Sequence, residues 1–298
     1  MDDAELYAKS SSLQQQFVNK VLQELWPALD WQCEQGTVLD VGCGAGDVTT
    51  YELLPRLPPG VSVLAVDISP AMIAKAADRF SGPRLCFRQL DIGTPRIEET
   101  DVWRLGPFPK VFSFFCLHWV QDQRLALQNI GKLLSPGGET VLIIVTGSPI
   151  YMMFETLSKS SRWSAYMMDY RQFEPPYVRT EDPVAVLTKY LHEAGFSVKT
   201  CRNEDSSYSS TDEQKVKNTI TAINPFVGRI PQQQREAFLQ DCVAEAYSNG
   251  TIRADTLPGG TVYSFPYSAM FAHAVKVHRV SRATSYSSNL HSNHTAGH

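Results

Sequence analysis

The sequence predicts an α/β protein with a Rossmann-like, doubly wound sheet and helical cap insertions. Three observations support this fold. Short apolar runs alternate with helix-length segments, a glycine-rich loop follows the first run, and Met- and Tyr-rich helical patterns begin near residue 149 of the 298. Strands that alternate with helices favour a parallel sheet with right-handed crossovers. With 43% hydrophobic and 19% charged residues, the chain has the composition of a globular protein.

The expected strands are apolar runs bounded by glycine, proline or acidic residues, a pattern typical of buried parallel strands. A helix is expected at 47–57, because Pro58-Pro59-Gly60 is a strong stop signal. A second helix opens at Ser69-Pro70, since serine favours the N-cap and proline the first helical position. The strands are predicted at residues 37–41, 61–66, 85–90, 111–116 and 141–145.

The second half of the chain predicts a cap over the sheet. Helical patterns cover about 150–170 and 212–247, separated by a short strand at 195–199. Residues 261–277 have strand-like composition, so we expect them to complete the sheet after the cap. The resulting division is an N-terminal helical segment over the active site at 1–35, a cofactor-binding core at 36–148, a helical cap with the closing strands at 149–280, and a disordered Ser- and His-rich tail at 281–298.

Composition excludes several classes of function. The net charge of −4, without a basic run, argues against a nucleic-acid partner. The six cysteines form no CxxC pair, so neither a metal site nor a disulfide framework is expected. The start is acidic and lacks the apolar region of a signal peptide, and the uncharged stretches 140–154 and 256–275 are interrupted by Pro and Gly. We therefore expect a cytoplasmic protein without a membrane span, and leave open whether it forms a homodimer.

The glycine loop carries a chemical signal. Gly42, Gly44 and Gly46 follow the first strand within the D-x-G-x-G-x-G sequence of residues 40–46. Glycine lets the backbone turn sharply and place its N–H groups against a ligand. A dinucleotide fingerprint needs glycine at position 47, where this chain has Asp47, which argues against a dehydrogenase. The spacing is that of methyltransferases that bind S-adenosylmethionine (SAM), although by itself such a loop is equally compatible with a plain strand-to-helix turn.

Acidic residues at neighbouring strand ends strengthen this interpretation. Asp40, Asp67 and Asp91 lie at the ends of the first three strands. The carboxyl ends of parallel strands meet in one crevice, where Asp67 is placed to accept the ribose hydroxyls of an adenosine. A single Asp is more often a loop residue or helix cap, but three at three strand ends favour a cofactor site. The residues expected to contact SAM are Asp40, Gly42, Gly44, Gly46, Asp67, Ile68, Met72, Asp91, Ile92 and Phe115.

Several short sequences carry a closer resemblance. They include Ser12-Leu13-Gln14, Asp67-Ile68-Ser69, Cys116-Leu117-His118-Trp119-Val120-Gln121, Pro136-Gly137-Gly138, Trp163-Ser164 and Asn224-Pro225-Phe226. With them the chain resembles class I methyltransferases over residues 37–145 and, across most of its length, the juvenile hormone acid methyltransferases of insects. The resemblance implies a SAM-dependent O-methyltransferase that esterifies the carboxylate of a farnesoic or juvenile hormone-like acid. It also implies that Gln14 and Trp119 hold that acid.

The chemistry of an acid substrate fits this implication. A carboxylic acid is ionised at neutral pH, so the displacement needs alignment and exclusion of water rather than a general base. The Gln14 amide and the Trp119 indole N–H are neutral donors that orient a carboxylate. Without the resemblance, Gln14 would be interpreted as an exposed helix residue and Trp119 as an aromatic residue of the core. His118 is either a third catalytic donor or a structural histidine.

Cap residues are candidates for the apolar wall of the substrate site, because Met and aromatic side chains adapt to irregular lipid chains. Core packing is the alternative for most of them. The sequence Glu174-Pro175-Pro176-Tyr177 resembles a motif of amino-methylating DNA enzymes, but it follows the fifth strand instead of the fourth. Two other functions stay open: methylation of another small lipophilic acid or hydroxyl compound, and SAM binding without catalysis. The cap residues expected to contact substrate are Tyr151, Trp163, Met167 and Phe226.

Overall fold

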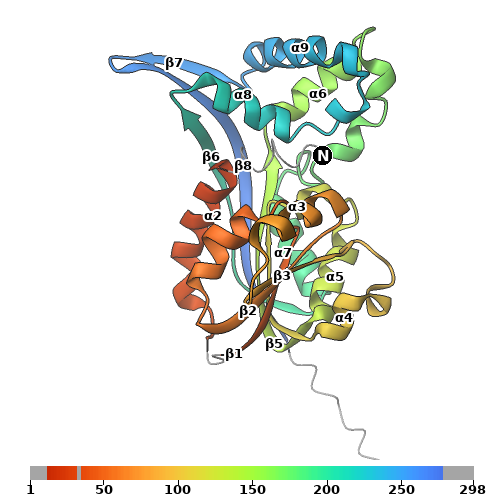
Figure 1. The fold of residues 1–298 in the computed structure, drawn as a ribbon, viewed down its shortest axis with the longest axis vertical. Coiled ribbons are helices and arrows are strands. Elements are labelled where there is room, and N and C mark those ends of the chain that lie inside the picture. Colours follow the sequence, from red (N-terminus) through yellow and green to blue (C-terminus); the bar gives the residue numbers. More distant parts are fainter. Residues whose placement is uncertain (1–11, 32–34, 278–298) are drawn as a thin grey trace, which may run out of the picture.

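The computed structural model describes residues 12–31 and 35–277, and it places a mixed sheet at the centre of the fold (Figure 1). The strand order is β3-β2-β1-β4-β5-β8-β6, with β7 paired to β8. Strands β1 to β5 pair in parallel, whereas β8 runs antiparallel between β5 and β6. The predicted α/β fold and the late closing strand are confirmed. The strands are β1 (Gln35–Val41), β2 (Gly60–Asp67), β3 (Leu85–Gln89), β4 (Phe108–Phe114), β5 (Leu134–Gly147), β6 (Phe196–Ser210), β7 (Arg253–Leu257) and β8 (Gly260–Lys276).

Helices cover both faces of the sheet. On one face α2 (Ser12–Leu25) and α3 (Pro70–Phe80) pack against the sheet together with the helical segment expected at 47–57, which consists mainly of a π-helix (Thr49–Leu53) and a 3-10 helix (Leu54–Arg56). On the other face lie α4 (Asp101–Leu105), α5 (Gln123–Leu133) and α7 (Pro183–Glu193). Apolar residues three or four apart give each helix a buried stripe, as in the Leu13, Phe17 and Val21 series of α2. The two buried layers hold the carboxyl ends of the parallel strands in a fixed order.

The cap lies beyond the carboxyl ends of the parallel strands (Figure 1). It contains α6 (Ile150–Ser158), α8 (Glu213–Ala222) and α9 (Arg235–Ser248), and the long strands β6 and β8 extend upward to reach it. Aromatic pairs fill its interior: the ring centroids of Trp163 and Phe238 are 5.1 Å apart, and those of Phe154 and Phe226 are 5.3 Å apart. This interior is continuous with the core on the α2 face of the sheet, so the cap is anchored to the cofactor-binding half.

Three predicted cap elements had wrong bounds. The helix expected at 150–170 ends at Ser158, and short 3-10 turns follow it. The helix expected at 212–247 is divided into α8 and α9, because Pro225 cannot continue a helix. The strand expected at 195–199 extends to Ser210: its polar second half lacks an apolar run, but its backbone pairs with β8 along its whole length. The length of β6 is therefore set by its pairing with the long strand β8, which no pattern in the local sequence shows.

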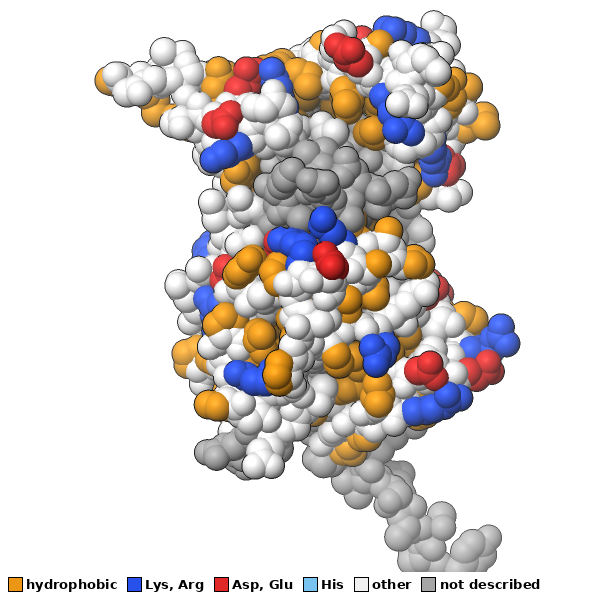
Figure 2. All heavy atoms as spheres, in the orientation of Figure 1, with side chains coloured by type: hydrophobic (Ala, Val, Ile, Leu, Met, Phe, Trp, Pro, Cys, Tyr) orange, Lys and Arg blue, Asp and Glu red, His pale blue; other side chains and the backbone are white. Residues whose placement is uncertain are grey.

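Two predictions concern residues outside the described ones, namely the part of the N-terminal segment at 1–11 and the tail at 281–298. Over residues 12–31 and 35–277, no helix combines the length and apolar character needed to cross a bilayer. Figure 2 shows basic and acidic side chains interspersed on the visible face, in keeping with the small net charge of −4.

Candidate active site

The glycine loop between β1 and the Thr49–Leu53 turn has the backbone that its sequence predicts. Gly42, Gly44 and Gly46 have φ angles of 81°, 53° and 86°, which favour glycine. A Cβ on Gly42 would lie 2.2 Å from Cys116, so any side chain there would clash. Asp47, which stands where a dinucleotide fingerprint has glycine, instead accepts two hydrogen bonds of 2.7 Å from the Arg79 guanidinium. This ion pair ties the loop to α3.

An open groove of about 540 Å³ runs along the carboxyl ends of β1 to β4. Asp40 lies beneath the loop rather than in the groove wall, and Gly46 packs against Phe80, Ala76 and Phe87. The remaining residues expected to contact SAM all line the groove: Gly42, Gly44, Asp67, Ile68, Met72, Asp91, Ile92 and Phe115.

Asp67 is positioned by the loop and by the start of α3. Its two carboxylate oxygens accept backbone N–H groups of Gly44 and Ser69, each at 2.9 Å. Each oxygen has a second lone pair, so both can also accept from the two hydroxyls of a ribose. Burial raises the pKa of Asp67. Beside it, Ile68 lines the groove and is 61% exposed, so its side chain offers an apolar surface that a flat aromatic base could cover. This part of the groove fits an adenosine.

Asp40 is buried under the loop, with 2% of its surface exposed. The Thr49 hydroxyl donates to it at 2.6 Å. Burial raises the pKa of Asp40 to about 7, an effect that the Thr49 hydrogen bond opposes and the Asp67 charge reinforces. Asp40 lines a narrow recess of about 20 Å³ together with Gln14, Asp47 and Val48. A cationic group placed in this recess would stabilise the ionised carboxylate.

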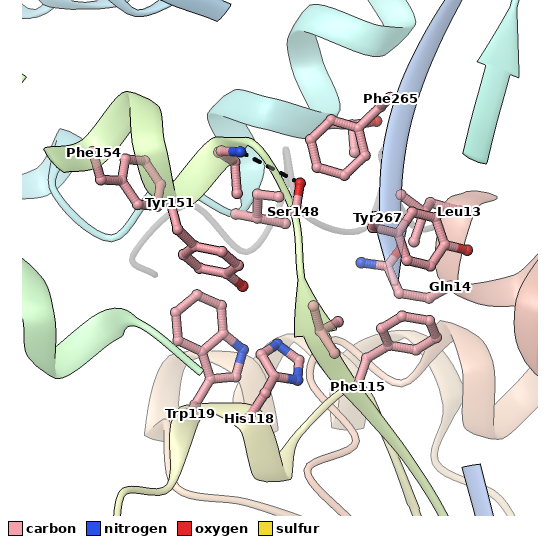
Figure 3. A pocket seen from close by; sticks show the side chains of 14 residues that line it. Leu13, Gln14, Phe115, His118, Trp119, Ser148, Tyr151, Phe154, Phe265 and Tyr267 are labelled. Atoms are coloured by element: carbon pink, nitrogen blue, oxygen red, sulfur yellow. Dashed lines mark hydrogen bonds between the residues drawn. The ribbon is translucent and has the colours of Figure 1, made fainter. Parts of the chain in front are cut away.

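A second, smaller cavity of about 50 Å³ adjoins the groove (Figure 3). Phe115 and Trp119 line both cavities and so form the partition between them. Phe115 has a φ of 52°, an uncommon conformation for a residue with a side chain, of the kind that persists at functional sites. The pocket is lined by Leu13, Gln14, Phe115, His118, Trp119, Val145, Ser148, Ile150, Tyr151, Phe154, Thr219, Ile223, Phe265 and Tyr267.

Polar side chains from three elements meet at the partition. Gln14 comes from α2, His118 and Trp119 from the turn after β4, and Tyr151 from α6. The Tyr151 hydroxyl points toward Trp119 and His118 in Figure 3. Among the described residues, Gln14 Oε1 and His118 Nδ1 are buried without a hydrogen-bond partner, each at a cost of about 1–3 kcal/mol. Burial lowers the pKa of His118 to about 3, so its ring is neutral at physiological pH.

The other cap candidates do not line this pocket. Trp163, Met167 and Phe226 are fully buried in the cap interior, and the Trp163 indole donates to Asp241 at 2.8 Å. Tyr177 of the Glu-Pro-Pro-Tyr sequence donates to Gln123 at 3.0 Å on the opposite face of the sheet, away from the groove. Within the described ranges, no group of three His, Cys, Asp or Glu side chains is arranged to hold a metal ion.

Several pocket residues were missed in the sequence. Phe265 and Tyr267 come from β8, Thr219 comes from α8, and Ile223 directly follows that helix. The alternation of aromatic residues at 263, 265 and 267 is a usable signal, since it places these side chains on one face of a strand. The position of α8 depends on its packing across β6 and β8, which the local sequence does not encode.

Fold, groove and glycine loop together define a class I, SAM-dependent methyltransferase. Residues 39–140 match a family described as a methyltransferase domain. The chain is 30% identical to juvenile hormone acid O-methyltransferase of Drosophila melanogaster over 93% of both chains. It is 33% identical to the Bombyx mori protein of that name, over 82% of this chain and 85% of that one. The chain belongs to this family of enzymes, as the sequence motifs indicated.

A solved structure supports the fold. A proposed methyltransferase from Bacillus halodurans superimposes with a TM-score of 0.52 at 16% identity, covering 87% of this chain and all of that one. The predictions of a transferase and of SAM as its cofactor are confirmed by the family.

Proposed function

We propose that the protein transfers the methyl group of SAM to the carboxylate of a farnesoic or juvenile hormone-like acid, which gives the methyl ester. The names of the Drosophila and Bombyx relatives support this substrate class. The observation that carries the proposal is the small cavity behind Phe115 and Trp119, which has neutral polar groups at the partition and apolar walls beyond it. Such a cavity suits a lipophilic acid whose carboxylate faces the cofactor.

The groove residues would hold SAM through its adenosine and amino-acid parts. Asp67 would accept the ribose hydroxyls, Ile68 and Met72 would contact the base, and the N–H groups of the glycine loop would approach the amino-acid tail. The bound cofactor supplies a methyl group activated by a sulfonium. Phe115 and Trp119 line both cavities, so the two ligands would meet beside these side chains, where a carboxylate oxygen could contact the methyl carbon directly and S-adenosylhomocysteine would be the leaving group.

The substrate carboxylate is already the nucleophile, so the protein has to orient it and exclude water. The Gln14 amide and the indole of Trp119 donate to its oxygens, and the neutral His118 ring and Tyr151 hydroxyl add donors on the same side. Among the described residues that line the pocket there is no Lys or Arg, whose charge would stabilise the carboxylate before the reaction. The arrangement orients the nucleophile without neutralising it.

The isoprenoid chain would lie against Ile150, Phe154, Ile223 and Phe265, which extend from the cap and β8. The cavity of about 50 Å³ has room for only a few water molecules. We infer that the cap side chains move apart to admit the acid and close over it, which would also remove water from the carboxylate. We further propose that the enzyme acts in the cytoplasm, in keeping with the free thiols of all five described cysteines. The homodimer stays a prediction that light scattering tests.

A substrate panel tests the proposed function. The purified protein is incubated with labelled SAM and with farnesoic acid, a juvenile hormone acid, a straight-chain fatty acid, a polar tricarboxylic acid and an isoprenoid alcohol. We expect methyl esters from the isoprenoid acids and little product from the others. Methylation of another acid or of the alcohol, with no reaction of the isoprenoid acids, would replace this substrate class. SAM binding without turnover on any compound would indicate a binding protein.

A further inference from the structure

Gln14 lies between the two ligand sites. It lines the substrate pocket behind Phe115, and it also lines the recess beside the glycine loop that contains Asp40. Among the described residues around these two cavities, no other residue is shared by both. The side chain belongs to α2 and only 6% of the residue's surface is exposed, so packing restricts it. A residue in this position is able to contact both ligands at once.

The two ends of the Gln14 amide have different environments. In Figure 3 the amide nitrogen points into the substrate pocket. The amide oxygen is buried and has no hydrogen-bond partner among the described residues. An ionised carboxylate only accepts hydrogen bonds, so the nitrogen is the end that can serve the acid. The oxygen is then left without a donor, and the acid cannot supply one.

The cofactor carries the missing donor. The α-ammonium of SAM has three N–H groups, and the amino-acid tail of a bound cofactor would lie toward the glycine loop, which lines part of the recess. Two carboxylates line this recess: Asp47 is already paired with Arg79, whereas among the described residues Asp40 accepts a hydrogen bond from Thr49 alone. The recess is therefore lined by a carboxylate that has no cationic partner among the described residues and by Gln14, whose amide oxygen is buried without a partner among them, and an ammonium group requires acceptors of this kind.

We propose that Gln14 binds both ligands, accepting from the α-ammonium of SAM through Oε1 and donating to the substrate acid through Nε2. The second contact rests on the proposed function, and the first does not. The ammonium fixes the orientation of the amide, because a flipped amide would turn its nitrogen toward a cation and its oxygen toward an anion. Gln14 is thus a positioning residue through which bound cofactor strengthens binding of the acid, and the coupling is reciprocal.

Calorimetry with two cofactor analogues tests the ammonium contact without turnover. The ligands are S-adenosylhomocysteine and its desamino analogue, S-(5′-deoxyadenosyl)-4-thiobutyrate, and no acid is present. We expect Gln14→Leu to weaken S-adenosylhomocysteine binding by about tenfold or more, the loss typical of a hydrogen bond to a charged group. Binding of the desamino analogue should stay unchanged. Gln16→Leu, an exposed position on the same helix, is the matched control and should change neither affinity.

Two outcomes would overturn the proposal: unchanged binding of S-adenosylhomocysteine to Gln14→Leu, or an equal loss for both ligands, which would indicate a purely structural role. If Gln14→Leu does not fold, Gln14→Glu carries the test. Its carboxylate still accepts, so the preference for S-adenosylhomocysteine over the desamino analogue should be kept or increased, and a smaller preference would contradict the contact. An enzyme that failed to methylate isoprenoid acids would leave these titrations unaffected, so the two proposals fail separately.

Discussion

Replacing Asp40 by asparagine should stabilise the protein without ligand, and more so as the pH rises. Asp40 is buried, and burial raises its pKa from 3.8 to about 7. Between these two pH values the folded carboxyl group is protonated while the unfolded one is ionised. The folded state therefore binds more protons, and stability falls as pH rises through this window and levels off above about pH 7. The asparagine amide would keep an acceptor for the Thr49 hydroxyl and carry no charge.

The size of the effect follows from the pKa difference. A pKa raised from 3.8 to about 7 corresponds to about 4 kcal/mol of destabilisation above pH 7, at about 1.4 kcal/mol per pKa step. At pH 5, which lies only about one unit above the unfolded pKa of 3.8, the same group costs less than half of this amount. The advantage of Asp40→Asn over the wild type should thus grow by about 3 kcal/mol between pH 5 and pH 8. For a chain of 298 residues, with an unfolding entropy of about 2.1 cal/mol/K per residue, that is a relative shift in Tm of roughly 5 °C.

Thermal unfolding of both proteins at pH 5, 6, 7 and 8, in the absence of cofactor, measures this difference. The change in relative stability with pH is diagnostic, because any packing effect of the new amide is the same at every pH. Asp40→Asn should also bind S-adenosylhomocysteine more weakly, since a charged partner of the ammonium is lost. A Tm difference between the two proteins that is constant from pH 5 to pH 8 would show that burial does not raise the pKa of Asp40, and it would contradict the prediction.

Three further predictions concern the two ligand sites. Trp119→Phe removes the indole donor and keeps most of the ring, so kcat/KM for the acid should fall by about tenfold or more in steady-state kinetics. The affinity for S-adenosylhomocysteine should stay near that of the wild type. An unchanged kcat/KM would refute the donor role. Asp67→Ala should weaken S-adenosylhomocysteine by about tenfold or more in calorimetry, because it removes the ribose acceptor and the anchor of the Gly44 N–H; equal affinity in a folded variant would contradict this assignment. With saturating cofactor, kcat should be flat from about pH 6.5 to 8.5, because His118, with its pKa lowered to about 3, stays neutral; a steep rise that His118→Ala abolishes would instead indicate a general base.

The cofactor half of the fold could be predicted because its signals are local. The apolar run before Gly42, the Ser69-Pro70 helix start and the acidic strand ends each depend on a few adjacent residues, and the Ser69 side chain does cap α3 by accepting from Met72 N at 3.3 Å. The second half of β6 could not be predicted in this way. Its polar residues are held in a strand by pairing with β8, more than fifty residues later in the chain.

The candidate site could also be predicted only in part. The groove contains most of the expected cofactor residues because their positions at strand ends follow from the parallel sheet. The roles of the cap residues were harder to predict, because the sequence does not distinguish an aromatic side chain that packs in an interior from one that lines a pocket. Trp163 and Phe226 belong to the interior, whereas Phe265 and Tyr267 reach the pocket through the register of β8. Only tertiary packing separates these two groups.

In the proposed reaction a methyl group passes from SAM to a carboxylate oxygen of an isoprenoid acid. Mass spectrometry of a reaction that contains SAM with a CD3 methyl group and farnesoic acid with both carboxyl oxygens labelled with ¹⁸O tests this transfer directly. We expect the wild type to form a methyl ester that carries the CD3 group and both ¹⁸O atoms, and Gln14→Leu to form much less of it. The absence of this ester, with the CD3 group found on a hydroxyl, on another acid or on no product, would contradict it.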